Sequence, residues 1–144
     1  MAVNSISGKM NRMILTEAQR TFLDEVYYAV IATLNPDGTI QQTVVWYLRE
    51  EENIRFSLGS GSIKARNLRH NPTISLTVED RQRYLTVRGT VEIGPPSDDL
   101  RRRLALRYRG SPEAAEEYLA NRPTSDAMAS ARITIQRVYG QGIR

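Results

Sequence analysis

The chain has 144 residues, with 40% hydrophobic and 25% charged residues, a composition typical of a single soluble globular domain over residues 1–144. Its formal net charge of +4 at pH 7 favours anionic partners such as phosphate esters, polycarboxylates or nucleic acid. The sequence contains no cysteine and one histidine, His70. Within one chain this excludes disulfides, thiolate chemistry, cysteine-ligated metals and sites that need several imidazoles.

The chain shows no targeting or membrane signal. No segment approaches the run of about 18 apolar residues that a membrane helix needs. The first 13 residues, MAVNSISGKMNRM, lack the apolar core of a signal peptide, and we expect a loosely ordered arm over residues 1–14. The sequence therefore predicts a cytoplasmic protein with no membrane partner.

Capping residues predict four helices. Thr16 has the spacing of a capping box with Gln19, and serines precede the later helices. Pro112 follows one of these serines at the position where a helix tolerates proline. The expected helices lie at 16–25, at 62–70, after Ser97 and after Ser111.

Six segments have the β-branched and aromatic composition of strands. The first two flank Asn-Pro-Asp-Gly at 35–38, which is a strong hairpin signal. Because few helices separate the strands, the order favours an antiparallel barrel over a parallel α/β sheet. The sequence therefore predicts a mainly β fold, a six-stranded antiparallel β-barrel with peripheral helices and strands at 27–34, 40–48, 54–59, 73–79, 84–94 and 131–140.

The most informative segment is FSLGSGSIKARNLRHNP, residues 56–72. A predicted strand ends in Gly-Ser-Gly-Ser and continues directly into a basic helix that carries Lys64, Arg66 and Arg69. Small residues let backbone N–H groups approach an anion, and the positive end of the helix dipole faces the same point. The segment predicts a phosphate site. The alternative is a turn that needs glycine, followed by a solvated basic helix.

Four segments, ATLNPDGTIQQTVVWY, SGSIKARNL, YLTVRGTVEI and RITIQRVYG, together resemble the split-barrel flavin and deazaflavin oxidoreductases. This superfamily includes the pyridoxamine 5'-phosphate oxidases and the F420-dependent reductases. The resemblance covers roughly residues 16–142 and implies a homodimer of FMN-binding split barrels that holds FMN or the deazaflavin F420 between its subunits. It also implies ring contacts from Gln41, Thr43, Val44 and Val45, phosphate contacts from Ser57, Ser60, Gly61, Ser62, Lys64, Arg66 and Asn67, and a contact from the second subunit by Tyr84.

Several of these positions have structural alternatives. The two valines at 44 and 45 fit a core or backbone contact equally well, and Asn67 fits a helix-stabilising residue. Trp46 either stacks on substrate or is a buried indole. His70 lies at a helix end, where interaction with backbone carbonyls is expected. The sequence assigns no catalytic residue and no metal site.

The resemblance implies hydride chemistry, in which the cofactor supplies the electrons and the protein supplies binding, orientation and electrostatics. The short chain and the KARNL run resemble the F420 branch, so we expect an F420-dependent oxidoreductase that acts on a small electron-poor organic substrate. Vitamin B6 oxidation is disfavoured because the C-terminal RITIQRVYGQGIR lacks the arginine and histidine pattern of the pyridoxamine 5'-phosphate enzymes. An FMN-dependent oxidoreductase and a cofactor carrier without turnover stay open.

Charge distribution bears on two of the alternatives. F420 carries an oligoglutamate tail, and arginines at 101–103, 107 and 109 offer a basic path for it, unless they only solvate a helix. Binding of single-stranded nucleic acid would need basic residues interleaved with aromatic ones. Only 7% of the residues are aromatic, and the basic residues gather at one strand-to-helix loop, so we expect no nucleic-acid partner.

Overall fold

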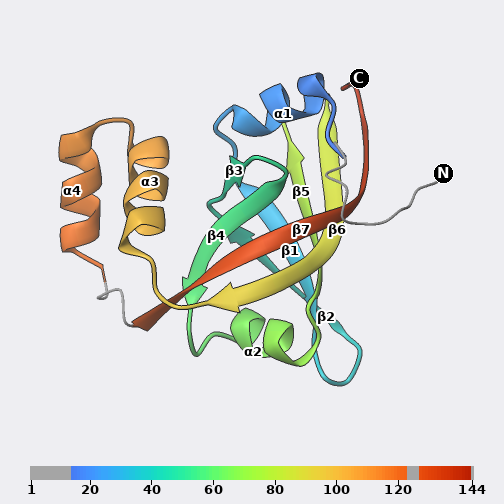
Figure 1. The fold of residues 1–144 in the computed structure, drawn as a ribbon, viewed down its shortest axis with the longest axis horizontal. Helices are drawn as coiled ribbons and strands as arrows, with labels where there is room; N and C mark the ends of the chain where they lie inside the picture. The colour runs from blue at the N-terminus through green and yellow to red at the C-terminus, as the bar shows by residue number, and fades with distance from the viewer. Residues whose placement is uncertain (1–13, 123–126, 144) are drawn as a thin grey trace.

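The computed structural model describes residues 14–122 and 127–143, which form seven strands and four helices (Figure 1). The helices are α1 (Glu17–Asp24), α2 (Ile63–His70), α3 (Asp98–Arg109) and α4 (Pro112–Ala120). The strands are β1 (Ala29–Leu34), β2 (Ile40–Val45), β3 (Leu48–Glu50), β4 (Asn53–Gly59), β5 (Thr73–Glu79), β6 (Tyr84–Gly94) and β7 (Met128–Gln141). The expected arm over residues 1–14 lies outside the described residues, except for Ile14, which packs against the core.

All the strands belong to one antiparallel sheet in the order β2-β1-β5-β6-β7-β4-β3. The prediction of a mainly antiparallel β fold is confirmed, but the prediction of six strands is wrong. The segment expected as one strand over 40–48 divides into β2 and β3 on either side of Trp46 and Tyr47. These two strands form the opposite edges of the sheet.

Two consecutive residues at this division, Tyr47 and Leu48, are both buried. Successive side chains of an extended segment point to opposite faces, and these two enter different hydrophobic clusters. Tyr47 belongs to the main core, where its hydroxyl donates to the carbonyl oxygen of Leu23 at 2.7 Å. Leu48 packs instead with Leu100 and Leu104 of α3. The segment between β2 and β3 therefore packs against the main core on one side and against α3 on the other.

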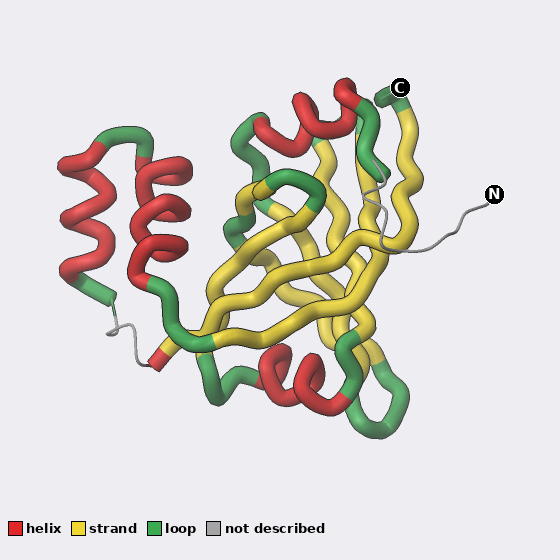
Figure 2. The backbone as a smooth tube through the Cα atoms, in the orientation of Figure 1, coloured by secondary structure: helices red, strands yellow, loops and turns green. Residues whose placement is uncertain are grey.

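The main core fills the inside of the curved sheet. In β4 the side chains of Ile54, Phe56 and Leu58 are buried and alternate with more exposed neighbours. Figure 2 shows α1 and α2 at opposite ends of the sheet, and each helix contributes apolar residues to the same core. The sheet and these two helices therefore form one packing unit.

Helices α3 and α4 form a hairpin that stands to one side of the sheet (Figures 1 and 2). Ser97 and Ser111 cap them as expected, with each serine Oγ accepting from a backbone N–H. Gly110 joins the helices with φ of 90°, a left-handed conformation that suits glycine. The hairpin attaches to the sheet through a small second cluster that includes Leu48, Leu100 and Trp46. No helix in the described ranges has the length and apolar character needed to span a membrane.

Candidate functional site

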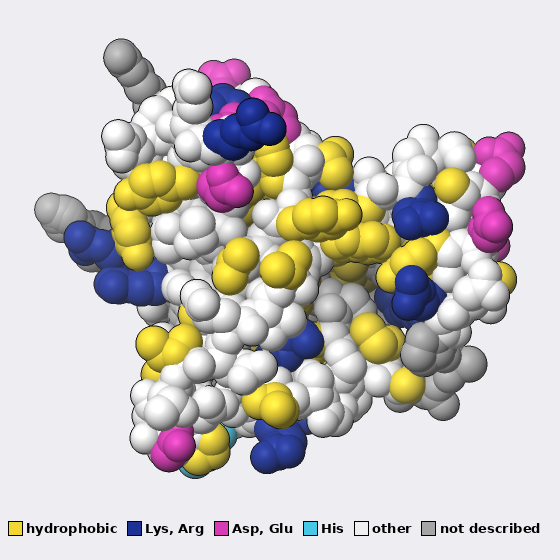
Figure 3. All heavy atoms as spheres, turned by 180° about the vertical axis from the view of Figure 1, so that it is seen from behind, with side chains coloured by type: hydrophobic (Ala, Val, Ile, Leu, Met, Phe, Trp, Pro, Cys, Tyr) yellow, Lys and Arg dark blue, Asp and Glu magenta, His cyan; other side chains and the backbone are white. Residues whose placement is uncertain are grey.

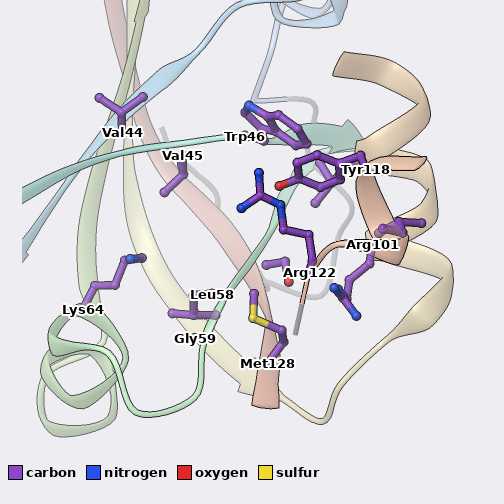
Figure 4. Close-up of a pocket in the computed structure, with 13 residues that line it drawn as sticks. Val44, Val45, Trp46, Leu58, Gly59, Lys64, Arg101, Tyr118, Arg122 and Met128 are labelled. Atoms are coloured by element: carbon purple, nitrogen blue, oxygen red, sulfur yellow. The ribbon is translucent and has the colours of Figure 1, made fainter. Parts of the chain in front are cut away.

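A cavity of about 380 Å³ lies between the sheet and the α3–α4 hairpin (Figure 4). Its volume falls within the range of small-molecule pockets, about 300 to 1,000 Å³. Residues from β2, β4, α2 and the hairpin form its walls. The lining residues are Val44, Val45, Trp46, Ser57, Leu58, Gly59, Lys64, Arg101, Leu104, Tyr118, Leu119, Arg122 and Met128.

One side of the cavity is formed where β4 passes into α2. Ser62 caps α2, since its Oγ accepts from the backbone N–H of Ala65 at 3.2 Å and donates to the carbonyl oxygen of Gly59 at 2.7 Å. This cap places Lys64 in the first turn of the helix, where its side chain lines the cavity (Figure 4), and Ser57 lines the same cavity. The expected strand, loop and basic helix therefore bring two of the candidate phosphate residues together.

Lys64 is a half-buried cation. Desolvation by burial lowers the pKa of its ammonium group, because a less polar surrounding disfavours the charged form. Among the described residues no carboxylate forms an ion pair with Lys64. A half-buried ammonium without a fixed counter-charge is suited to binding an anionic ligand.

Edge strand β2 offers backbone groups at the same cavity. It pairs only with β1, so the N–H and C=O groups on its other side have no strand partner. Val44 and Val45 both line the cavity, Val45 as a buried residue at 8% exposure and Val44 as an exposed one at 60%. A flat ligand beside β2 would meet free backbone groups and an apolar wall.

Asn67 has a structural role within the chain. Its side chain is buried, and its Nδ2 donates to Thr33 Oγ1 at 3.1 Å and to Asn35 Oδ1 at 2.9 Å. These bonds fasten α2 to the end of β1 and to the hairpin turn that follows. The structural alternative for Asn67 therefore has direct support, and Asn67 does not line the cavity.

The loop between β4 and α2 is held by Arg69. The guanidinium of Arg69 donates to the carbonyl oxygen of Ser60 at 2.8 Å and to its Oγ at 3.3 Å. The Ser60 hydroxyl is thus engaged within the chain. The remaining candidate residues also lie outside the cavity wall, and they are Gln41, Thr43, Gly61, Ser62, Arg66 and Tyr84.

Trp46 lies in a column of aromatic rings. It stacks on Tyr108 with ring centroids 4.7 Å apart, and its ring centroid lies 4.9 Å from that of Tyr118, at a tilt of 34°. Tyr108 is fixed in turn, since its hydroxyl donates to the carbonyl oxygen of Tyr27 at 2.6 Å and accepts from the backbone N–H of Tyr47 at 3.2 Å. Both faces of the indole are therefore occupied by protein, which favours the structural alternative over stacking on substrate.

The arginines of α3 do not form one continuous basic surface. Arg103 pairs with Glu50 at 2.7 Å and Asp99 at 3.5 Å. Arg107 donates to three carbonyl oxygens at the end of α1. Of the arginines in the expected basic path, Arg101 lines the cavity. The cavity also contains Arg122, which the sequence did not single out because its position depends on how the helical hairpin docks on the sheet.

Comparisons with known proteins agree with this fold. The family model described as pyridoxamine 5'-phosphate oxidase matches residues 15–142. No curated protein sequence matches the chain. Among solved structures, an F420 reductase has 29% identity and a TM-score of 0.73, with 87% of this chain and 98% of that chain covered.

Two further solved structures share the fold at lower identity. The conserved hypothetical protein Rv2991 from Mycobacterium tuberculosis has 24% identity and a TM-score of 0.72, and the match covers 89% of this chain and 85% of that one. HupZ from Group A Streptococcus has 18% identity and a TM-score of 0.63, and the match covers 88% of this chain and 94% of that one. At these identities the similarity shows a shared fold and nothing about function.

Proposed function

Because the chain belongs to the pyridoxamine 5'-phosphate oxidase family, we propose that it is an F420-dependent oxidoreductase that transfers a hydride between the deazaflavin and a small electron-poor organic molecule. The observation that carries the proposal is the cavity that Lys64, Ser57 and residues of edge strand β2 line together, in which Lys64 has no carboxylate partner among the described residues. The Ser57 hydroxyl donates to the carbonyl oxygen of Ala129 at 3.5 Å, a long bond that a ligand can replace. The similarity to an F420 reductase supports F420 as the cofactor.

The residues of the cavity fit a phosphorylated ligand with a flat ring. Lys64 and Ser57 hold the phosphate, with Arg66 of the same helix as a further cation. The backbone N–H groups of Ser60 and Ser62 do not take part, since they donate to the carbonyl oxygens of Ala127 at 3.1 Å and Gly59 at 3.0 Å. The free edge of β2, from Gln41 to Val45, binds and orients the ring. When bound, the cofactor supplies or accepts the hydride.

The cavity also limits the source of the proton that accompanies the hydride. Of its described lining residues, Ser57 and Tyr118 carry hydroxyl groups, and none carries a carboxyl or imidazole group. The candidate proton sources are therefore solvent, one of these hydroxyls or the ammonium group of Lys64. The chain contributes binding and orientation, in agreement with hydride transfer, which needs no protein nucleophile.

Titration of the purified protein with F420 and FMN tests this function. We expect submicromolar binding of F420, weaker binding of FMN, and oxidation of reduced F420 by an enone or nitro compound. A yellow protein with flavin absorbance and no affinity for F420 would support the alternative, an FMN-dependent oxidoreductase of the same fold. Tight F420 binding without oxidation by any acceptor would support a carrier protein.

The exposed face beside the cavity supports a homodimer. Val30 and Val44 are paired across β1 and β2 and are 40% and 60% exposed, and Tyr28 nearby is 65% exposed. Hydrophobic side chains lie across the middle of the face seen in Figure 3. Exposed apolar patches of this kind mark interaction surfaces. A second copy seated here would cover Val44 at the cavity rim and bring its own Tyr84 toward the cofactor.

Two charged substitutions on this face test the dimer. We expect Val30→Asp with Val44→Asp to convert the protein to a monomer, because two carboxylates would be buried without partners. Sedimentation velocity at micromolar protein concentration measures the oligomeric state. The affinity for F420 should also fall at least about 10-fold, equivalent to about 1.4 kcal/mol. Arg102→Gln, at an exposed position of α3, serves as the control. A wild-type monomer with full cofactor affinity would contradict the proposal.

A further inference from the structure

Arg122 follows α4 and extends into the cavity toward the side where Lys64 lies (Figure 4). The central carbon of its guanidinium lies 4.4 Å from the centre of the Tyr118 ring. Contact with an aromatic face stabilises an arginine without using its hydrogen-bond donors. Among the described residues no carboxylate pairs with Arg122, so its donors can bind a ligand.

The Tyr118 ring that contacts Arg122 is fixed by other aromatic side chains. Tyr118 packs on Trp46, and Trp46 stacks on Tyr108, whose hydroxyl is bonded to the backbone at Tyr27 and Tyr47. The aromatic column thus connects the guanidinium to the sheet through three packed rings. Because the side chain is already positioned, less conformational entropy is lost when a ligand binds.

Three cationic side chains line the cavity, those of Lys64, Arg101 and Arg122. Within residues 14–122 and 127–143, no acidic side chain lines the cavity and no carboxylate forms an ion pair with Arg122. Arg122 and Lys64 therefore place two unpaired cations on opposite sides of one cavity. A planar guanidinium matches the two oxygens of a carboxylate better than an ammonium does.

We propose that Arg122 binds a carboxylate group of the molecule in the cavity, across from the phosphate that Lys64 binds. This inference rests on the proposed function. The carboxylate belongs either to the cofactor, as in the glutamate tail of F420, or to an acceptor that is itself a carboxylic acid. From the sequence, arginines of α3 either offered a path for the anionic tail or solvated a helix, and this proposal adds the residue that follows α4.

The first arm of the test compares two cofactors. F420 carries phosphate and carboxylates, whereas FMN carries phosphate without a carboxylate. If the cofactor supplies the carboxylate, Arg122→Gln should weaken F420 binding about 10-fold or more and change FMN binding less than about twofold. Arg122→Lys, which keeps the charge but not the planar pair of donors, should restore part of the affinity. Arg102→Gln should match wild type.

The second arm uses the cofactor-loaded protein and benzoate as a small carboxylate probe. If the acceptor supplies the carboxylate, benzoate should perturb the absorbance of the bound cofactor in wild type, and Arg122→Gln should weaken this binding about 10-fold or more while both cofactors bind normally. Thermal unfolding of each variant, measured by circular dichroism, separates loss of binding from loss of folding.

The remaining outcomes overturn the inference in distinguishable ways. Unchanged F420 and benzoate binding in a folded Arg122→Gln protein would remove Arg122 as a carboxylate site and leave the proposed function intact. Equal weakening of F420 and FMN would show that Arg122 acts on the phosphate or on the fold instead. Failure of wild type to bind either cofactor would remove the proposed function and this inference with it.

Discussion

Lys64→Ala is expected to raise the dissociation constants of F420 and FMN about 10- to 150-fold while leaving the fold intact. The loss of a charge-assisted hydrogen bond to phosphate costs about 1.5 to 3 kcal/mol, which corresponds to that range. The folded protein should not lose stability, since the substitution removes a half-buried ammonium that has no carboxylate partner among the described residues.

Fluorescence titration with three ligands measures this effect. Riboflavin has the ring of FMN but no phosphate, so its affinity should be the same in wild type and in Lys64→Ala. His70→Gln, at the exposed end of the same helix, is the control variant and should change no affinity. An unchanged FMN affinity in Lys64→Ala would remove Lys64 from the phosphate site.

The same lysine makes binding depend on pH in a defined direction. Burial lowers the pKa of Lys64 in the free protein, and a bound phosphate raises it again by favouring the charged form. Phosphate affinity is therefore full below the pKa of the free protein and falls as the pH rises from that value toward the pKa of the complex. The fall should appear below the ordinary lysine pKa of about 10.4, and Lys64→Ala should abolish it.

Features determined by neighbouring residues could be predicted from the sequence. Thr16 and Ser97 cap their helices as expected because an N-cap bond spans only three residues. The hairpin turn at 35–38 is confirmed, with Gly38 at φ of 89° and the backbone N–H of Asn35 donating to the carbonyl oxygen of Thr39 at 2.8 Å. Such contacts need only neighbouring residues, so they do not depend on the tertiary structure.

Features determined by distant contacts could not be predicted in this way. The packing of Tyr47 depends on α1, where the carbonyl oxygen of Leu23 accepts from its hydroxyl, and the packing of Leu48 depends on α3. Asn67 lies in a basic run that indicates phosphate binding, yet its partners are on β1 and the turn after it. Arg122 belongs to the cavity only because the helical hairpin docks beside β2. Local patterns carry no information on these contacts.

The second large effect is expected at Gly89, where β6 and β7 approach most closely. The register between these strands shifts between Arg88 and Gly89. A Cβ added at Gly89 would lie 1.9 Å from the carbonyl oxygen of Thr134 and 2.9 Å from its carbonyl carbon. Both atoms are backbone, so no side-chain rotation can relieve the clash. Strand β7 would have to move.

That movement would reach the functional site, because β7 also pairs with β4, with Ser57 opposite Ser130. We expect Gly89→Ala to destabilise the protein by about 3 kcal/mol or more, which corresponds to a fall in Tm of roughly 10 °C for a chain of this size. Gly61→Ala is the matched control, since a Cβ there would meet nothing within 4 Å. Thermal unfolding followed by circular dichroism compares the two variants with wild type. If Gly89→Ala unfolds within about 2 °C of Gly61→Ala, the strands do not approach this closely at the bulge, and the proposed transmission of strain from β6 to the strand that carries Ser57 is wrong.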